Sequence, residues 1–197
     1  MRIITGLFKG KKLFTLEGVT TRPTTDFIRE MIFSTLYDLD VDMANVLDLY
    51  AGCGSLGFEA LSRGAEKVTF VEGSKKAVST LIANINHLKC KDRCKIELKK
   101  VETHCLRLPV DEKYTLIFLD PPYDKGLVNT TLSLLFEVNK QSLHEDCVIV
   151  AEHSFGEPID ECFRRYVIKE KVNKPIVVTF LKYRLLKFKD IGCGTFI

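Results

Sequence analysis

Four residues that could perform group-transfer chemistry stand together at Asp120, Pro121, Pro122 and Tyr123. They follow the apolar residues 116–119, which predict a buried strand, and ligands of open α/β sheets bind at the carboxyl ends of strands. Proline fixes its own φ angle and favours an extended conformation in the residue before it, so Asp120 and Pro121 are both rigid. Neither proline has an amide hydrogen, which leaves the Asp120 carboxylate and the Pro121 carbonyl as fixed acceptors.

Two acceptors on a rigid backbone match the two hydrogens of an exocyclic amine on a nucleobase. Such an amine is a poor nucleophile because its lone pair is delocalised into the ring. Hydrogen bonds from both hydrogens favour a pyramidal nitrogen and stabilise the positive charge that grows there during attack on a methyl group. The Tyr123 ring offers a face for base stacking, worth about 1–3 kcal/mol in single-strand sites. The four residues therefore predict N-methylation of a base that has left its stack.

A glycine loop precedes this corner in the chain. Gly52, Gly54 and Gly57 fit the pattern G-x-G-x-x-G between a predicted strand and a predicted helix. The pattern indicates a close approach of a ligand to the backbone, and Glu72, at the end of the next predicted strand, suits a pair of ribose hydroxyls. Sites for dinucleotides and for S-adenosylmethionine share both features.

Asp48 distinguishes these two ligands by its charge. It stands just before the glycine turn, where the pyrophosphate of a dinucleotide would lie against the helix N-terminus. A carboxylate there repels a pyrophosphate by about a kcal/mol or more, whereas it attracts the sulfonium and the ammonium of S-adenosylmethionine. Asp48 therefore favours S-adenosylmethionine as cofactor. A carboxylate that only hydrogen-bonds the glycine turn is compatible with either ligand.

The elements that position these residues alternate between β-rich runs and amphipathic helical patterns. Strands are predicted at residues 46–50, 68–72, 95–98, 115–120 and 147–152, and helices at 56–63, 74–88 and 127–139. This alternation predicts a doubly wound, Rossmann-like α/β fold with a mostly parallel sheet. Two further strands, at 166–172 and 176–182, are separated by a short connection, so we expect them to form an antiparallel edge of a seven-stranded sheet.

An N-terminal extension precedes the alternating elements. Glycines at positions 6 and 10 predict a small hairpin, and residues 22–39 predict a helix. Thr25 is the expected N-cap, and Asp26 stands in the first turn, where negative charge is favoured. We predict that residues 1–42 form this extension and that residues 43–197 form the catalytic core.

The composition is that of an ordinary globular protein, with 46% hydrophobic and 28% charged residues and a net charge of +3. Basic residues gather at Lys9, Lys11 and Lys12, at 89–100 and at 182–189. Each group fits a solvated surface, and a phosphate-binding face is the alternative. No apolar run approaches membrane-spanning length, so we expect no membrane partner.

The seven cysteines include no C-x-x-C pair, and the start of the chain lacks the apolar run of a secretory signal. These features predict reduced thiols in the cytoplasm. Cys90 and Cys94 are not followed by a second ligand pair with finger spacing, so no metal site is predicted. We interpret the scattered histidines as structural or surface residues.

Four segments together resemble the bacterial ribosomal small-subunit methyltransferase D family: RPTTDFIRE, LDLYAGCGSLGFEALSRGA, FVE and LDPPY. The resemblance runs over residues 1–172. It implies the class I methyltransferase fold, S-adenosylmethionine as donor and the N2 amine of a guanine in 16S ribosomal RNA as target. The implied partner is 16S ribosomal RNA or the assembling small subunit, and we expect a cytoplasmic monomer.

The resemblance also assigns roles to residues. The methionine end of the donor would contact Asp48, Gly52, Gly54 and Gly57, and Glu72 would hold the ribose. Where the family often has an Asp-Ala pair at the adenine, this chain has Val101 and Glu102, and we take Glu102 as the candidate. Residues 120–123 would form the amine site. The segment from Arg22 to Arg29 would close over the pocket, and the expected RNA contacts are Arg22, Thr24, Arg29, Lys9, Lys11 and Lys12.

Other functions share part of this pattern. A DNA adenine N6-methyltransferase uses the same amine chemistry, but reading a DNA site needs more mass than the about forty residues outside the core. Release-factor glutamine methyltransferases have Asn where Asp120 stands. A NAD-binding oxidoreductase or a non-catalytic Rossmann module would leave Asp120 and Tyr123 without a role.

Overall fold

The computed structural model describes residues 1–16, 26–105 and 108–183 of the chain. Three residues with predicted roles lie outside these ranges: Arg22 and Thr24, which were expected to contact RNA, and Thr25, the expected N-cap. The basic residues that follow Tyr183 also lie outside them. Within the described ranges, no helix combines the length and the apolar character that a membrane span requires.

The core is a seven-stranded sheet with the strand order β3-β2-β1-β4-β5-β7-β6. Its strands are β1 (Asn45–Leu49), β2 (Lys67–Glu72), β3 (Cys94–Leu98), β4 (Tyr114–Leu119), β5 (Leu143–Ser154), β6 (Val167–Asn173) and β7 (Ile176–Lys182). Strands β1 to β5 pair with one another in parallel, and β7 is antiparallel to both β5 and β6. The prediction of a mostly parallel sheet with an antiparallel edge is confirmed.

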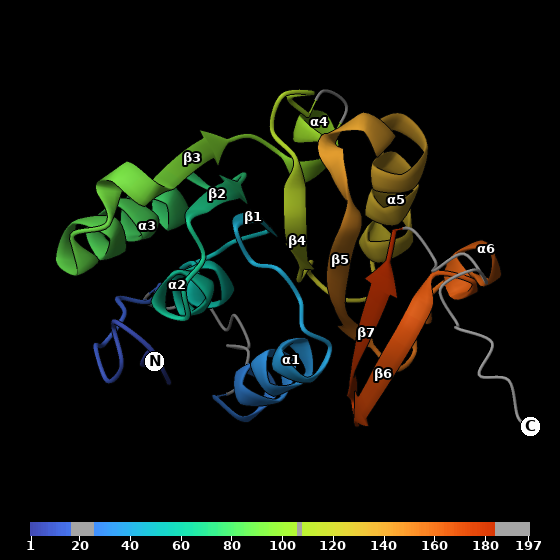
Figure 1. The fold of residues 1–197 in the computed structure, drawn as a ribbon, viewed down its shortest axis with the longest axis horizontal. Helices are drawn as coiled ribbons and strands as arrows, with labels where there is room; N and C mark the ends of the chain where they lie inside the picture. Colours follow the sequence, from blue (N-terminus) through green and yellow to red (C-terminus); the bar gives the residue numbers. More distant parts are fainter. Residues whose placement is uncertain (17–25, 106–107, 184–197) are drawn as a thin grey trace, which may run out of the picture.

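Helices cover both faces of this sheet, as apolar parallel strands require. They are α1 (Asp26–Asp38), α2 (Ser55–Ser62), α3 (Lys75–Leu88), α4 (Val101–His104), α5 (Leu127–Ser133) and α6 (Glu161–Arg164). One apolar cluster joins α1, α2 and α3 to one face, and a second cluster joins α4, α5 and α6 to the other. Figure 1 shows α2 and α3 at the left of the sheet and α5 and α6 at the right.

Three details differ from the predicted elements. Strand β5 begins at Leu143, four residues before its predicted start, because its first residue pairs with Tyr114 across a register shift. The predicted helix at 127–139 divides into α5 and a π-helical turn, Leu134–Val138. Helices α4 and α6 have four residues each, which is too short to produce a helical pattern in the sequence.

The N-terminal loop, residues 1–16, folds back on itself as the small hairpin that the glycines predicted. One antiparallel bridge joins Arg2 and Lys12, and the amide of Ile3 donates to the Lys11 carbonyl oxygen at 3.0 Å. This loop packs on the end of α2. The amides of Leu7 and Phe8 donate to the carbonyl oxygen and the hydroxyl of Ser62, at 2.7 and 2.9 Å. Gly6 has φ +85°, and a Cβ there would lie 1.8 Å from the Ser62 carbonyl oxygen. Only glycine fits this contact.

Glu59 of α2 is fully buried and attaches the N-terminal loop to the core. Its carboxylate accepts the amides of Ile4 and Thr5 at 2.8 and 3.0 Å. It also accepts a hydrogen bond from Nε of Arg63 at 2.8 Å, and Nε of Arg29 lies 3.6 Å away. One buried anion therefore holds the N-terminal loop, α1 and α2 together.

The prediction that Arg29 contacts RNA is wrong. The Arg29 side chain is buried beneath α1, where its Nη2 donates to the Arg2 carbonyl oxygen and to Asp26. Its guanidinium faces Glu59 instead of solvent. A cation in this position stabilises the attachment of α1 and is not accessible to a phosphate group.

Candidate active site

The carboxyl ends of four adjacent parallel strands form one row across the sheet. Residues that pair with one another in this row are Val71, Leu49, Leu119 and Ala151. The next residue along each strand therefore lies at the same edge of the sheet. These residues are Glu72, Tyr50, Asp120 and Glu152.

The pleat of the sheet brings acidic side chains from four strands to one face. Asp48 pairs with Phe70 on one side and with Phe118 on the other, and Phe118 pairs with Val150. Side chains two residues apart share a face of a strand. Glu72 and Glu152 lie two places beyond such partners within β2 and β5 and therefore share the face of Asp48, which α1 to α3 cover. Asp120 stands two places beyond Phe118, directly after β4, and continues the same alternation. The resulting acidic row, as we call it, is Asp48, Glu72, Asp120 and Glu152.

Asp48 lies against the glycine loop and is 2% exposed. Its Oδ2 accepts the amide hydrogen of Gly57 at 2.9 Å. A Cβ at Gly57 would lie 2.3 Å from the Phe70 ring and 2.9 Å from Asp48 Oδ2, so the helix can approach the strand this closely only with glycine. Gly54 precedes α2 with φ +83°, a conformation that glycine adopts without penalty.

Burial raises the pKa of Asp48 to about 8. The hydrogen bond from Gly57 opposes this shift, and the nearby charge of Glu72 adds to it. A carboxyl group with this pKa is largely protonated at neutral pH until a cation stabilises its charged form. The buried acid is therefore suited to a positively charged ligand.

Glu72 fixes the first turn of the glycine loop. Its Oε2 accepts the amide of Gly52 at 2.9 Å, and its Oε1 accepts the amide of Ser74 at 2.7 Å. Gly52 has φ +56°, and a Cβ there would meet nothing closer than the Tyr50 carbonyl oxygen at 4.0 Å. Open space therefore adjoins this turn, where the predicted donor would lie.

Glu102 of α4 reaches the same edge of the sheet. The Tyr50 hydroxyl donates to its Oε1 at 3.3 Å and shares a 3.1 Å hydrogen bond with the Thr131 hydroxyl. Tyr50 has φ +59°, which directs its ring towards the α4 and α5 side. Sequence reasoning missed this residue, because an aromatic residue before a glycine loop does not reveal a positive φ angle.

The Asp120–Tyr123 corner follows β4 directly, so the structure brings it to the edge that holds the glycine loop. Tyr123 is half-buried and packs against the cluster beneath α1 to α3. Its hydroxyl donates to Glu152, which is 3% exposed. Sequence reasoning also missed Glu152. A single acid at the end of an apolar strand was its only signal.

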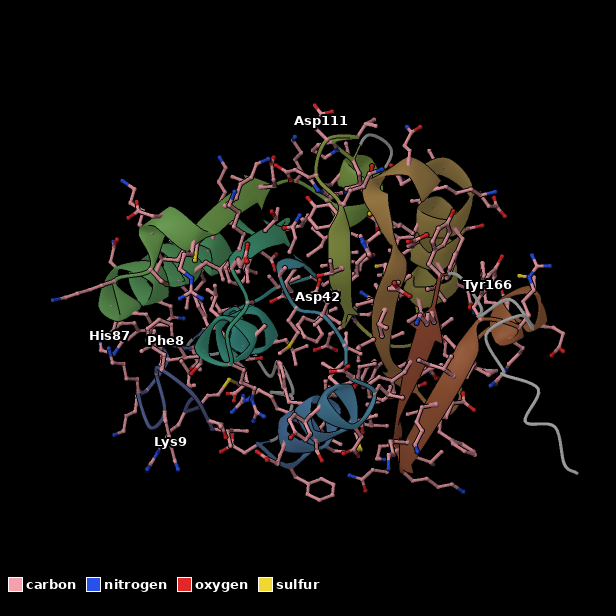
Figure 2. All side chains as sticks on the ribbon, viewed as in Figure 1. Phe8, Lys9, Asp42, His87, Asp111 and Tyr166 are labelled. Carbon is pink, nitrogen blue, oxygen red and sulfur yellow. The ribbon has the colours of Figure 1, made fainter. Side chains whose placement is uncertain are left out.

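The three lysines that were predicted to contact RNA belong to a different part of the molecule from these acids. Lys9, Lys11 and Lys12 are exposed on the N-terminal loop. This loop runs beside the end of α3, where the Phe14 ring lies 5.5 Å from the His87 ring, and Figure 2 shows Lys9 and His87 at the same end of the molecule. The structure therefore presents these basic groups on the surface, whereas at the sheet edge Asp48 and Glu152 are buried and Glu72 and Asp120 are half-buried.

Comparisons with known proteins agree with this architecture. The model of the family described as Conserved hypothetical protein 95 matches residues 1–182. Ribosomal RNA small subunit methyltransferase D of Haemophilus influenzae is 36% identical over 172 residues, which cover 87% of this chain and 88% of the relative.

Solved structures share the fold. A protein of Escherichia coli has a TM-score of 0.81 at 30% identity and covers 93% of this chain and 98% of its own. An RNA methyltransferase of Salinibacter ruber, solved with S-adenosyl-L-homocysteine, has a TM-score of 0.59 at 15% identity over 82% of this chain and 95% of its own. The fold is that of class I methyltransferases, and the chain belongs to the ribosomal RNA small subunit methyltransferase D family.

Proposed function

We propose that this protein transfers a methyl group from S-adenosylmethionine to the N2 amine of a guanine in 16S ribosomal RNA. Family membership supports ribosomal RNA methylation in general. The observation that carries the finer proposal is the acidic row, which joins a glycine loop to a rigid Asp-Pro-Pro-Tyr corner on one face of the sheet. The protein acts in the cytoplasm as a monomer in this proposal.

The proposed donor site contains acidic residues that favour a positively charged ligand such as S-adenosylmethionine. Asp48 is buried against the glycine loop, where it accepts the amide of Gly57, and its charged form is favoured by an ammonium or a sulfonium. Open space adjoins the same loop at Gly52. In this proposal Asp48, Gly52, Gly54 and Gly57 hold the methionine end, Glu72 holds the ribose and Glu102 contacts the adenine. The same acids would repel the pyrophosphate of a dinucleotide.

The amine site consists of the residues after β4. S-adenosylmethionine supplies an electrophilic methyl group when bound. The Asp120 carboxylate and the Pro121 carbonyl accept the two amine hydrogens, which favours a pyramidal nitrogen and stabilises its developing positive charge. Tyr123 supports the base by stacking, and its hydroxyl bond to Glu152 holds the ring. The proton then leaves to water or to Asp120.

Acids line the proposed site and lysines lie outside it, and this arrangement favours a substrate whose base enters the site while its phosphates do not. The acidic row repels phosphate groups, so only a base that has left its stack can enter the site while its backbone stays outside. Lys9, Lys11 and Lys12 would contact that backbone from the extension formed by residues 1–42. Arg22 and Thr24 are further proposed contacts outside the described residues.

Transfer from tritiated donor tests the substrate class. The purified protein is incubated with unmodified small subunits, with free 16S ribosomal RNA, with large-subunit RNA and with single- and double-stranded DNA. The proposal requires label in 16S ribosomal RNA, either free or in the subunit. Label in DNA alone would support the adenine N6 alternative. Stabilisation by NAD equal to that by S-adenosylhomocysteine in a thermal melt would contradict the donor site.

Donor binding is expected to depend on pH through Asp48. Burial raises the pKa of Asp48 to about 8 in the free protein, and a bound ammonium favours its charged form. The complex then binds fewer protons than the free protein, so affinity for S-adenosylhomocysteine should rise from pH 6 towards about 8. The same raised pKa also affects the stability of the free protein. Between about pH 4 and about pH 8 the folded protein keeps a proton on Asp48 that the unfolded chain has lost, so the free energy of unfolding should fall as pH rises.

Isothermal titration calorimetry in buffers of different ionisation enthalpy measures this linkage directly. The wild type should release protons on binding at pH 7. Asp48→Asn should bind more weakly at pH 8 and lose most of the pH dependence. A wild-type affinity that is constant between pH 6 and 8, or an equal pH dependence in Asp48→Asn, would exclude Asp48 from the donor site.

Two substitutions at Tyr123 separate stacking from hydrogen bonding. Tyr123→Ala should lower the rate of methyl transfer about 10- to 100-fold, because it removes a stacking face worth about 1–3 kcal/mol. Tyr123→Phe should keep much of that activity, because the ring remains and only the bond to Glu152 is lost. Steady-state kinetics with small subunits provide the measurement. Normal turnover in Tyr123→Ala would remove stacking from the mechanism.

A further inference from the structure

The backbone that follows the Asp120–Tyr123 corner forms a left-handed turn. Asp124 has φ +58° and Gly126 has φ +68°. Glycine adopts this conformation without a steric penalty, but Asp124 carries a Cβ and does so less readily. Disfavoured backbone angles persist only where the surrounding structure holds them. Other side chains must therefore hold this turn.

One carboxylate holds both ends of the turn. Glu157 Oε2 accepts the amide of Asp124 at 2.7 Å, and Glu157 Oε1 accepts the amide of Gly126 at 2.6 Å. Amides that converge in a left-handed turn form a site for an anion, and short hydrogen bonds to a charged acceptor are among the stronger ones. Ser154 adds a third bond, because its hydroxyl donates to Asp124 Oδ1 at 2.7 Å.

The segment that carries Glu157 is itself fixed to the core. It follows β5, and the amide of Glu157 donates to the Ser154 carbonyl oxygen at 3.1 Å. The Asn129 side chain of α5 bonds the Pro158 carbonyl oxygen and the Asp160 amide, each at 3.0 Å. Glu157 is half-buried, and among the described residues it forms no salt bridge. Both of its oxygens serve the turn.

We propose that Glu157 is a positioning residue for methyl transfer, which fixes the backbone that presents Asp120 and Tyr123 to the target amine. This inference rests on the proposed function. The two prolines restrain the corner from the strand side, and the Glu157 carboxylate restrains it from the opposite side. Because reacting groups displaced by about 1 Å lose about 10²-fold in rate, loss of this restraint should reduce turnover rather than donor binding.

Three variants test the inference by kinetics and by hydrogen exchange. Glu157→Ala removes both acceptors, and Glu157→Gln replaces one oxygen with an NH2 group that cannot accept an amide hydrogen. Both should lower kcat about 10- to 100-fold at saturating donor and RNA, with the Kd for S-adenosylhomocysteine within twofold of wild type. Amide exchange across residues 123–127 should accelerate. Glu161→Gln is the matched control, because Glu161 is an exposed acid of the same segment, and it should change neither measurement.

Two results would overturn the inference. One is a kcat for Glu157→Ala within twofold of wild type at a temperature where every variant is folded, even if its melting temperature falls. The other is unchanged exchange at residues 123–127. If the wild type transfers no methyl group to 16S ribosomal RNA, the proposed function fails instead, and hydrogen exchange still shows whether Glu157 holds the turn.

Discussion

Asp120→Ala should lower kcat for methyl transfer by about 10²- to 10³-fold and leave donor affinity within about twofold. The expected size is that of removing one preorganised group that stabilises charge in a transition state. Asp120 is the charged member of the acceptor pair, and it stands at the end of β4 opposite the glycine loop. The substitution removes stabilisation of the amine nitrogen and keeps Glu72 and Asp48, whose carboxylates accept the amides of Gly52 and Gly57 in the glycine loop.

The control for this variant comes from the other end of the same strand. Asp111 precedes β4 and is exposed, and Figure 2 shows it at the top of the molecule. Asp111→Ala should therefore have normal kcat. Asp120→Asn keeps one acceptor oxygen and should lie between Asp120→Ala and wild type. Turnover of Asp120→Ala within about fivefold of wild type would exclude the carboxylate from the transition state.

Glu59→Ala should lower the free energy of unfolding by about 3–5 kcal/mol, the usual cost of removing one partner from a buried ion pair. Glu59 is fully buried, and its removal leaves the buried Arg29 guanidinium without this anion. The amides of Ile4 and Thr5 lose their acceptor as well. The N-terminal loop should then detach from α2 before the core unfolds.

Urea unfolding measures this effect, with Glu66→Ala as a control at an exposed acid beyond the same helix. The double variant Arg29→Met with Glu59→Leu should be less destabilised than the sum of the two single variants, because it leaves no unpaired buried charge. A loss in Glu59→Ala of less than about 1 kcal/mol would show that the contacts around Glu59 contribute little to stability.

Local patterns predicted the core of this fold. Apolar runs bounded by glycine loops and helical patterns predicted the strands β1 to β5 and their alternation with helices, because each signal lies within about ten residues of the element that it defines. Gly57 was predictable for the same reason, since a close helix–strand contact follows a strand in a recognised pattern. The short helices α4 and α6 have too few residues to show a period.

Partners that are distant in the sequence were not predictable. Arg29 resembled a solvent-facing cation on α1, and only the fold brings it to Glu59, thirty residues away. Glu152 and Glu157 act on Tyr123 and Asp124 across a similar separation, through the pairing of β4 with β5. A single charged residue in a sequence does not indicate whether its charge will be solvated by water or paired with a buried partner.

The identity of the methylated nucleoside tests the central claim most directly. Small subunits that lack the modification are incubated with the protein and labelled donor, and the 16S ribosomal RNA is then digested to nucleosides and separated. The acceptor pair of Asp120 and Pro121 predicts that the label elutes as N2-methylguanosine, at one methyl group per subunit. Label in N6-methyladenosine, or on a ring nitrogen or a ribose oxygen, would contradict the assignment of this site to the guanine amine.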